Sequence, residues 1–309
     1  MLDYIARRLL WLPVLLIIVS LFVFLLGLFG PGDPVEVRLG QNYTPERAER
    51  LREQLGLDDP FWTQYIRYVG NALKGDFGES FRYPGRSVTS VIGPPMWVSF
   101  QLNIAALLIT LGFGLPLGFY VAKRQGRWID PVIVTIALVI AAVPLPVMAA
   151  LLVLVFSLSF DLVPTSGWGG FFDARVVLPA VAIGIPGIAG IIRYMRASTV
   201  EVLNQDYVRT ANAKGLGQMA VNTRHIARNA LVPIVTILGF TFAGLLGGTF
   251  IGEILFGIPG VARLSLEAIS QRDYNVIMAF ALIGATTLVV VNLVVDIAYT
   301  VIDPRIRLK

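Results

Sequence analysis

The segment Leu9–Phe29, LLWLPVLLIIVSLFVFLLGLF, carries no charged side chain and directly follows Arg7 and Arg8. A helix needs about 20 apolar residues to cross the hydrocarbon core of a bilayer. The segment is longer than the apolar part of a signal peptide, and no small-residue cleavage pattern follows it. It therefore predicts a transmembrane helix at the start of the chain.

The rest of the chain has the same character. Of its 309 residues, 56% are hydrophobic and only 15% are charged, and the mean hydropathy is +0.73. A soluble domain carries more charge, and a disordered chain is far less hydrophobic. We therefore predict an all-α integral membrane protein with six transmembrane helices. The five further spans are expected at Val98–Val121, Val132–Phe160, Val176–Ile192, Leu231–Phe256 and Val276–Ile302.

Prolines interrupt several of these spans. Pro116, Pro144, Pro146 and Pro186 all lie inside predicted helices. A proline in a membrane helix is tolerated where neighbouring helices or a wet cavity satisfy the freed carbonyl groups. Each one is compatible with a simple packing kink or with the lining of a cavity.

Several kinds of chemistry are excluded by composition. The chain has no cysteine and one histidine, His225, so thiolate and multi-histidine metal centres and cysteine nucleophiles are ruled out within it. It has no phosphate-binding G-x-x-x-x-G-K-[ST] loop. We expect no catalytic, cofactor or metal site in this chain, which disfavours a membrane-embedded enzyme.

The basic residues predict the orientation. Although the net charge is +5, Lys and Arg gather at the ends of apolar runs, as in membrane proteins, with no sign of a nucleic-acid surface. They are concentrated in the N-terminus, the loop after the second span, the stretch 193–230 and the C-terminal tail. The positive-inside rule then places both termini in the cytoplasm, so residues 30–97 lie outside.

The segment 30–97 predicts a small helical insertion. Thr44 is a suitable N-cap for a helix with Pro45 at its first position and Gly56 at its end. A second helix is expected after Pro60, with Phe61, Tyr65, Tyr68 and Leu73 largely on one side and Gly75 closing it. The chain thus divides into the first transmembrane helix (1–29), the external insertion (30–97) and a five-helix core (98–309) that includes the cytoplasmic loop 193–230.

Small and ionisable residues mark the fifth span. Gly244, Gly248 and Gly252 recur every four residues, which predicts one helix face of close backbone approach. This face is compatible with tight packing within the chain or with a subunit interface. Few charges lie in the spans, and Glu253 and Asp296 are either interfacial or paired. The lack of midplane acidic residues favours an energy source outside the chain.

The loop between the fourth and fifth spans holds the most informative pattern. Ser198-Thr199-Val200-Glu201 has the spacing of a capping box, and Asp206–Lys214 follows as a short helix that ends at Gly215. Helical spacing places Tyr207, Thr210, Ala211 and Lys214 on one face. Its small side chains would let a partner groove approach closely, although an ordinary basic loop fits the same composition.

These segments resemble a known family of transporters. The runs DYVRTANAKGL (residues 206–216) and RHIARNALVP (residues 224–233) are similar to the coupling loop of permeases of ABC importers. They are closest to the dipeptide/oligopeptide/nickel branch, in the subunit with the larger external insertion. The motifs PGDP (31–34), LGLD (55–58), GDFG (75–78) and DPRIR (303–307) fit the same branch, so the resemblance covers essentially the whole chain.

The resemblance implies a type I ABC-importer permease in the plasma membrane of a bacterium or archaeon. Its implied partners are a second, related permease, two cytoplasmic ATPase subunits that use ATP and Mg²⁺, and an external substrate-binding protein. The ATPase-coupling residues would be Asp206, Tyr207, Arg209, Thr210, Ala211, Lys214 and Gly215. Arg209 stands where the general importer pattern has Glu, so no salt bridge of that Glu is expected here.

The implied cargo is di- or oligopeptides. Oligosaccharides and nickel complexes are the alternatives within the branch, which also includes glutathione importers. An ATP-independent secondary carrier is the alternative from another class of transport protein.

Overall fold

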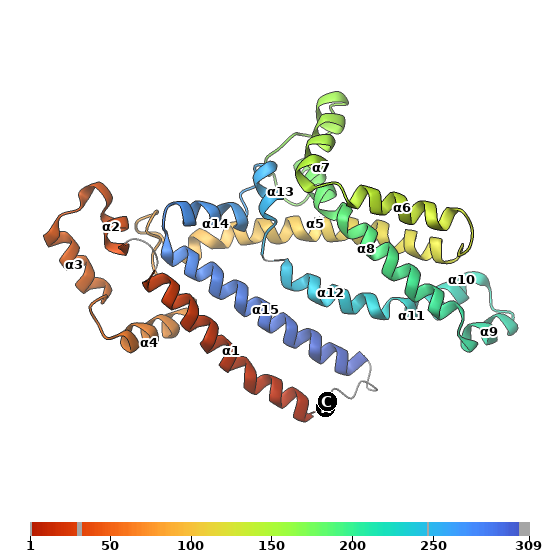
Figure 1. Cartoon of the computed structure of the whole chain (residues 1–309), viewed down its shortest axis with the longest axis horizontal. Helices are drawn as coiled ribbons and strands as arrows, with labels where there is room; N and C mark the ends of the chain where they lie inside the picture. Colours follow the sequence, from red (N-terminus) through yellow and green to blue (C-terminus); the bar gives the residue numbers. More distant parts are fainter. Residues whose placement is uncertain (1, 30–32, 246, 303–309) are drawn as a thin grey trace. The chain divides into compact units, whose positions relative to one another are not determined.

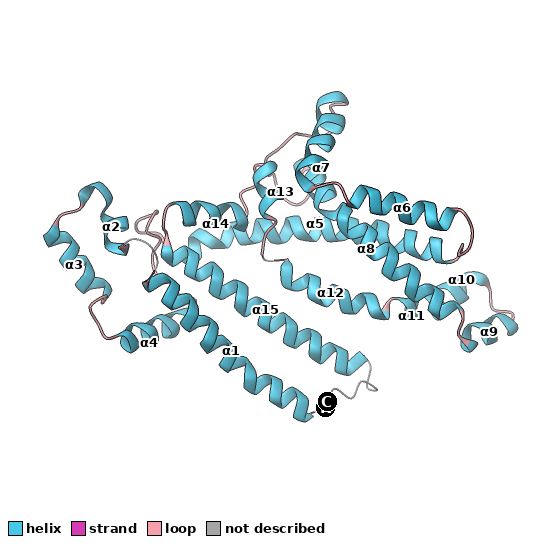
Figure 2. Ribbon diagram, viewed as in Figure 1, coloured by secondary structure: helices cyan, strands magenta, loops and turns pink. Residues whose placement is uncertain are grey.

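The computed structural model describes residues 2–29, 33–245 and 247–302. The motif residues Pro31 and Gly32, and the segment 303–307, lie outside these described residues. Helices make up the regular structure of the described chain, apart from an isolated β-bridge between Glu79 and Ser87 (Figure 2). The prediction of an all-α protein is therefore confirmed for this part of the chain.

The chain divides into two compact units. Unit 1 comprises Met1–Val98 and Gly260–Lys309, and unit 2 comprises Ser99–Pro259. The predicted boundary at residue 97 thus falls within one residue of a unit boundary. The last predicted span is in unit 1 together with the first one.

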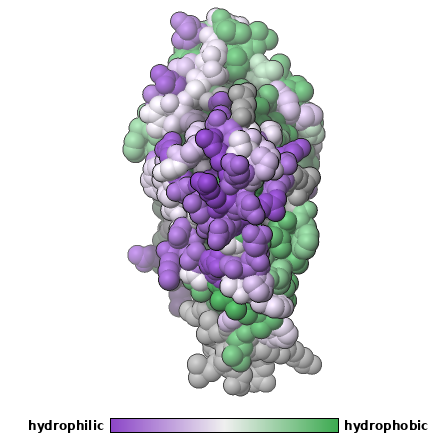
Figure 3. Space-filling model, turned by 90° about the vertical axis from the view of Figure 1, so that its left-hand side faces the viewer, coloured by the Kyte–Doolittle hydropathy of each residue, from purple (hydrophilic) through white to green (hydrophobic). Residues whose placement is uncertain are grey.

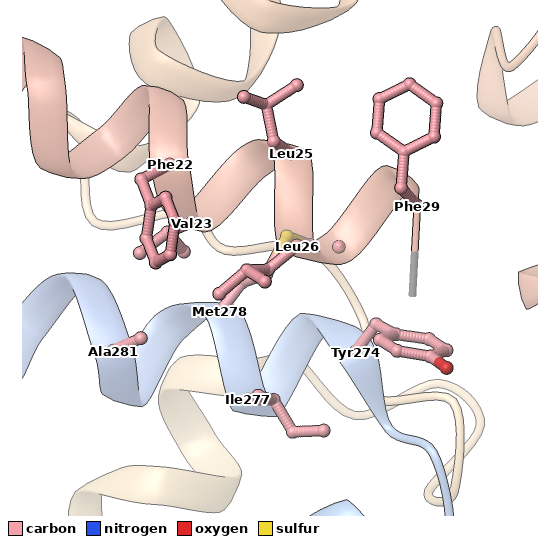
Figure 4. Close-up of a pocket in the computed structure, with 10 residues that line it drawn as sticks. Phe22, Val23, Leu25, Leu26, Phe29, Tyr274, Ile277, Met278 and Ala281 are labelled. Atoms are coloured by element: carbon pink, nitrogen blue, oxygen red, sulfur yellow. The ribbon is translucent and has the colours of Figure 1, made fainter. Parts of the chain in front are cut away.

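Two long helices form the centre of unit 1. Helices α1 (Leu2–Leu28) and α15 (Tyr274–Ile302) pack side by side (Figure 1). Met278 reaches from α15 toward α1, where Gly27 has no side chain to block it (Figure 4). An apolar pocket of about 550 Å³ lies next to this contact, between the two helices. Both helices agree with the predicted first and sixth spans.

The insertion begins with short helices held by charged residues. Helices α2 (Pro34–Leu39) and η1 (Gly40–Asn42, a 3₁₀ turn) lead to α3 (Pro45–Leu55). Thr44 caps α3 by accepting a hydrogen bond from the Arg47 amide at 3.3 Å, and Gly56 ends it with a left-handed φ of 61°, both as predicted. An ion pair between Arg52 and Asp33 joins α3 to the cap of α2. Hydrophilic residues gather over the part of unit 1 that carries α2 and α3 (Figure 3).

Helix α4 (Phe61–Ala72) packs against α1. The ring of Phe24 lies 5.5–5.6 Å, between centroids, from the rings of Phe61, Tyr65 and Tyr68. Such aromatic pairs add to the energy of apolar burial. The prediction that Leu73 shares this packed face is wrong, because its side chain is exposed.

The insertion continues directly into a long helix. Helix α5 (Val88–Ala122) begins ten residues before the predicted second span. Its first turns bury Val88, Val91 and Ile92 together with residues of α14 (Val261–Ser270) and α15. The sequence analysis did not predict α14. Next to this cluster, the buried Asp273 accepts a hydrogen bond from the Ser80 hydroxyl at 2.5 Å and fixes the loop before α5.

In unit 2, the predicted third span is bent. Helix α6 (Ile129–Ala141) is followed by α7 (Leu145–Leu152) and the π-helix η2 (Val153–Ser159). The axis of α6 and the axis of the segment Leu145–Ser159 make an angle of 97°. The bend falls at Pro144, which cannot continue α6 because it lacks an amide proton and restricts the preceding residue. The interruption expected at Pro144 and Pro146 therefore takes the form of a sharp bend, and the two helices together can still be one span.

The described chain contains four helices that are long and apolar enough to cross a membrane, or five if the bent pair is one span. They are Leu10–Leu28, Val88–Ala122, Ala174–Leu203 and Tyr274–Val294, with the pair Ile129–Ala141 and Leu145–Ser159. The fifth predicted span, Leu231–Phe256, is not one helix. It divides into α12 (Val232–Gly244) and α13 (Phe250–Leu255).

Candidate functional site

The predicted coupling segment forms a separate short helix. Helix α9 (Asp206–Ala213) follows an extended Gln205, and Lys214 is its C-cap. Gly215 then has a φ of +73°, which a residue with a side chain adopts only at a cost. The prediction of a short helix that ends at Gly215 is confirmed.

The inner face of α9 belongs to the core of its own unit. Val208 and Ala211, three residues apart, are 3% and 4% exposed. They pack in one apolar cluster with residues of the helical segments before and after α9, such as Met195 and Ile226. The prediction that Ala211 faces a partner's groove is therefore wrong, because the chain itself covers this side chain.

The outer face of α9 carries the remaining predicted coupling residues. The side chains of Asp206 and Arg209 are almost fully exposed, and their ion pair at 3.5 Å lies on the surface. Thr210 is also exposed, with its hydroxyl donating to the Asp206 carbonyl oxygen at 3.0 Å. The exposed residues of this surface, which we call the α9 outer face, are Asp206, Tyr207, Arg209, Thr210 and Lys214, with Leu216 and Met219 just beyond the helix.

Helix α8 connects this region to the rest of unit 2. After the 3₁₀ turn η3 (Ala174–Val176), α8 (Val177–Leu203) runs eleven residues past the predicted end of the fourth span. Ser198 and Thr199 are buried inside it, so the predicted capping box is wrong: these residues do not begin a helix. Because α8 runs without a break to within three residues of α9, it is a stiff link between α9 and the apolar part of unit 2.

A second nearly continuous helical stretch leads away from α9. Helix α10 (Gln218–Ala220), the π-helix η4 (Val221–Ala227), α11 (Arg228–Ala230) and α12 follow one another with only Leu231 between the last two. Val221, Ala230 and Ile234 belong to the same apolar cluster as Ala211. The α9 helix is therefore packed against both long helical stretches that it connects.

An elongated groove lies between α5, α8 and α12. It has a volume of about 450 Å³ and is lined mainly by apolar and small residues. Its polar lining residues are Asn103, Thr110, Tyr194 and Thr241. Thr110 already donates a hydrogen bond to the Gly184 carbonyl oxygen at 2.9 Å. None of the lining residues is charged, so the groove offers neutral hydrogen-bonding groups in an apolar wall.

One end of this groove is formed by the break between α12 and α13. The side-chain amide of Asn103 donates to the carbonyl oxygen of Leu245 at 2.8 Å, just past the end of α12. Glu253, which is fully buried, accepts hydrogen bonds from the Ser99 hydroxyl at 2.6 Å and the Thr249 amide at 3.2 Å. Backbone groups freed by a helix break are thus satisfied by side chains, as non-helical backbone at membrane depth requires.

The prediction that Gly244, Gly248 and Gly252 share one helix face is wrong, because the helix breaks between them. Gly244 is the last residue of α12, Gly248 has a left-handed φ of 70° outside any helix, and Gly252 lies in α13. Gly252 is in close packing: a Cβ atom on it would lie 3.0 Å from Ile183 Cδ1. A Cβ on Gly244 would meet nothing within 4 Å. The four-residue spacing did not produce one face because the helix ends between the first two glycines.

A buried ion pair fixes α6 to α8. Arg196 Nε and Nη2 donate to the two carboxylate oxygens of Asp130 at 2.6 and 2.7 Å. Asp130 is 5% exposed. Two parallel hydrogen bonds between guanidinium and carboxylate are strong and set the geometry of both groups. The sequence analysis missed this pair because 66 residues separate its members.

Within the described residues, no group of three or more His, Cys, Asp or Glu side chains is placed to hold a metal ion. The fold and the site together describe an apolar helical protein with a mainly apolar groove that has four polar lining residues, and with one short helix whose outer face is exposed. These features are compatible with a transport subunit.

Comparison with known proteins agrees with this class. Residues 114–308 match the family described as binding-protein-dependent transport system inner membrane component. Residues 1–97 match its companion N-terminal family, described as binding-protein-dependent transport system membrane component, N-terminal. The chain belongs to this family of inner-membrane permeases of ABC importers.

The chain also has full-length relatives. It is 38% identical over 312 residues to the glutathione transport system permease protein GsiC of Escherichia coli K12, with 100% of both chains covered. It is 34% identical over 310 residues to the probable peptide ABC transporter permease protein y4tP of Sinorhizobium fredii, with 98% of this chain and 99% of the relative covered. The resemblance inferred from short motifs is therefore confirmed over the whole chain.

Proposed function

We propose that this permease serves an ATP-driven importer of di- and oligopeptides. The permease forms the translocation pathway together with a second, related permease. Two cytoplasmic ATP-binding subunits supply the energy from ATP and Mg²⁺, and an external binding protein delivers the cargo. The names of its full-length relatives, one a glutathione permease and one a probable peptide permease, support a peptide cargo.

The observation that carries the coupling role is the division of α9 into two faces. Its inner face is fixed by Val208 and Ala211 to the cluster shared with α8 and α12, and its outer face is exposed. A force applied to the outer face therefore reaches the groove through packed side chains. We assign the outer face, at Asp206, Tyr207, Arg209, Thr210 and Lys214, to contact with an ATPase subunit. Gly215 shapes the end of the helix.

The groove supports a peptide cargo by its chemistry. Tyr194 offers a neutral hydroxyl. Asn103 and Thr241, which donate to the carbonyl oxygens of Leu245 and Ile237, still offer neutral acceptor oxygens that suit the amide groups all peptides share. The absence of charge among the lining residues lets peptides with differently charged side chains pass equally well. Discrimination between cargoes then falls to the external binding protein.

The test is peptide uptake by the complete importer in proteoliposomes loaded with ATP. Thr210→Arg places a long cation on the α9 outer face, and we expect it to reduce both uptake and co-purification of the ATPase subunits. Thr63→Arg makes the same change at an exposed position of α4 and should leave both unchanged. Full uptake and ATPase retention in Thr210→Arg would contradict the coupling role.

The same assay separates the alternatives. Uptake that persists without the ATPase subunits would indicate a secondary carrier. Uptake of an oligosaccharide or a nickel complex, with no competition from peptides, would overturn the peptide assignment and leave the coupling role intact.

The proposed orientation places both termini and α9 in the cytoplasm and the insertion outside. Because the chain has no cysteine, single cysteines test this directly. In intact cells, an impermeant thiol reagent should label Asn71→Cys and should label Gln218→Cys only after permeabilisation. Both positions are exposed in the structure. Labelling of Gln218→Cys in intact cells would reverse the orientation.

A further inference from the structure

Helix α4 exposes a line of large apolar side chains. Trp62, Ile66 and Leu73 follow one another at intervals of four and seven residues, which places them along one side of the helix. They are 62%, 68% and 84% exposed. A contiguous apolar face of this kind on a short helix is typical of a surface that contacts another apolar phase.

The adjoining exposed side of α4 is polar. Thr63, Arg67, Asn71 and Lys74 recur at intervals of three and four residues, and all four are exposed. Arg67 also forms an ion pair with Asp59, just before the helix. The helix therefore has a strongly polar, basic face and an apolar face, the combination found in helices that lie along a membrane surface.

Contacts with α1 set the depth of α4. The Tyr65 hydroxyl is hydrogen-bonded to the Ser20 hydroxyl at 2.8 Å and donates to the Ile17 carbonyl oxygen at 3.2 Å. Ser20 lies eight residues before Leu28, the end of α1, which is about 12 Å along the helix axis. Tyr65 is thus held beside the apolar run of the first transmembrane helix and not beyond its end.

The contact lies within the uncharged part of α1. The residues of α1 that touch α4 are Ile17, Ser20 and Phe24. All three belong to the segment Leu10–Leu28, which is long and apolar enough to cross a membrane. Because α4 packs against the side of this segment, its exposed apolar residues lie at the depth of the acyl chains.

We propose that α4 lies in the membrane surface, with Trp62, Ile66 and Leu73 inserted among phospholipid acyl chains. Thr63, Arg67, Asn71 and Lys74 then face the headgroups and water, where the two cations are close to anionic phosphates. The insertion is thereby anchored to the bilayer as well as to α1. This inference rests on the membrane family and is independent of the cargo and of the role of α9.

Spin-label accessibility measures the environment of each face. In the complete importer, reconstituted in a phospholipid bilayer, Leu73→Cys and Lys74→Cys are each labelled with a nitroxide in a chain that has no other cysteine. The second pair, Ile66→Cys and Arg67→Cys, repeats this comparison of the apolar and the polar face near the middle of α4. Oxygen concentrates in the acyl region, whereas a water-soluble nickel chelate is excluded from it.

We expect the ratio of oxygen to nickel-chelate accessibility to be several-fold higher at Leu73 and Ile66 than at Lys74 and Arg67. Equal ratios with full access of the chelate would show that the apolar line faces water. Protection of Leu73 and Ile66 from both reagents would show that a protein partner covers it. Either result would overturn the proposal. Leu73 is 84% exposed, so its replacement removes little packing and the protein should still fold.

Discussion

The ion pair between Asp130 and Arg196 makes a quantitative prediction about stability. Replacing Arg196 by Met removes both guanidinium hydrogen bonds and leaves the Asp130 carboxylate buried without its counter-charge. The Arg196 side chain is 32% exposed, so water offsets part of the loss and we expect a cost of about 1–3 kcal/mol. We therefore expect Arg196→Met to lower the thermal unfolding midpoint of the purified permease strongly.

The double variant Asp130→Leu with Arg196→Met should recover most of this loss, because two apolar side chains leave no uncompensated charge. Arg193→Met is the matched control. Arg193 lies one helical turn before Arg196 and lines a small groove on the surface of α6 and α8 together with Asp130 and Arg196. Its side chain is exposed, so its replacement should have little effect on the unfolding midpoint. The midpoints are compared in one detergent at equal protein concentration. A double variant no more stable than Arg196→Met alone would refute the reasoning.

Three further predictions concern single positions. Gly252→Val should destabilise the permease by about 1–3 kcal/mol because its side chain would be forced against α8, whereas Gly244→Val, in open space, should be tolerated in the same thermal assay. Gly215→Val should cost about 1–2 kcal/mol at its positive φ and reduce ATPase co-purification, whereas Gly217→Val, without a positive φ, should not. The buried hydroxyl of Tyr68 has no hydrogen-bond partner among the described residues, so Tyr68→Phe should raise stability by about 1 kcal/mol at neutral pH. Burial, with the nearby Tyr65, raises the pKa of the Tyr68 hydroxyl to about 12. The unfolded chain therefore loses this proton at a lower pH than the folded protein, and the free energy of unfolding should fall as the pH rises from about 10 to about 12. A pH series of unfolding midpoints should show this fall in the unmodified protein and its loss in Tyr68→Phe.

Local signals in the sequence predicted local structure well. Thr44, Pro45 and Gly56 define the ends of α3, and Gly215 ends α9, because caps depend on neighbouring residues alone. The long apolar runs at Leu9–Phe29 and Val276–Ile302 likewise predicted α1 and α15, since hydrophobic length alone decides a membrane helix.

Features that depend on distant residues were not predictable in this way. Ala211 looked like a partner-facing small residue, but which face of α9 is buried is set by the cluster formed with α8 and α12. The break after Gly244 depends on Asn103, far away in sequence, which satisfies the backbone of Leu245. Hydropathy is continuous across that break, so it predicted one helix where there are two.

The central claim is that the α9 outer face is where the ATPase subunit binds. A photoreactive amino acid at Tyr207, which is 42% exposed on that face, tests it in the assembled importer. We expect irradiation to join the permease to an ATPase subunit, and the same photoreactive residue at Thr63 in α4 to give no such product. If the Tyr207 variant retains uptake but yields no cross-link to the ATPase subunit, the energy input enters the permease elsewhere.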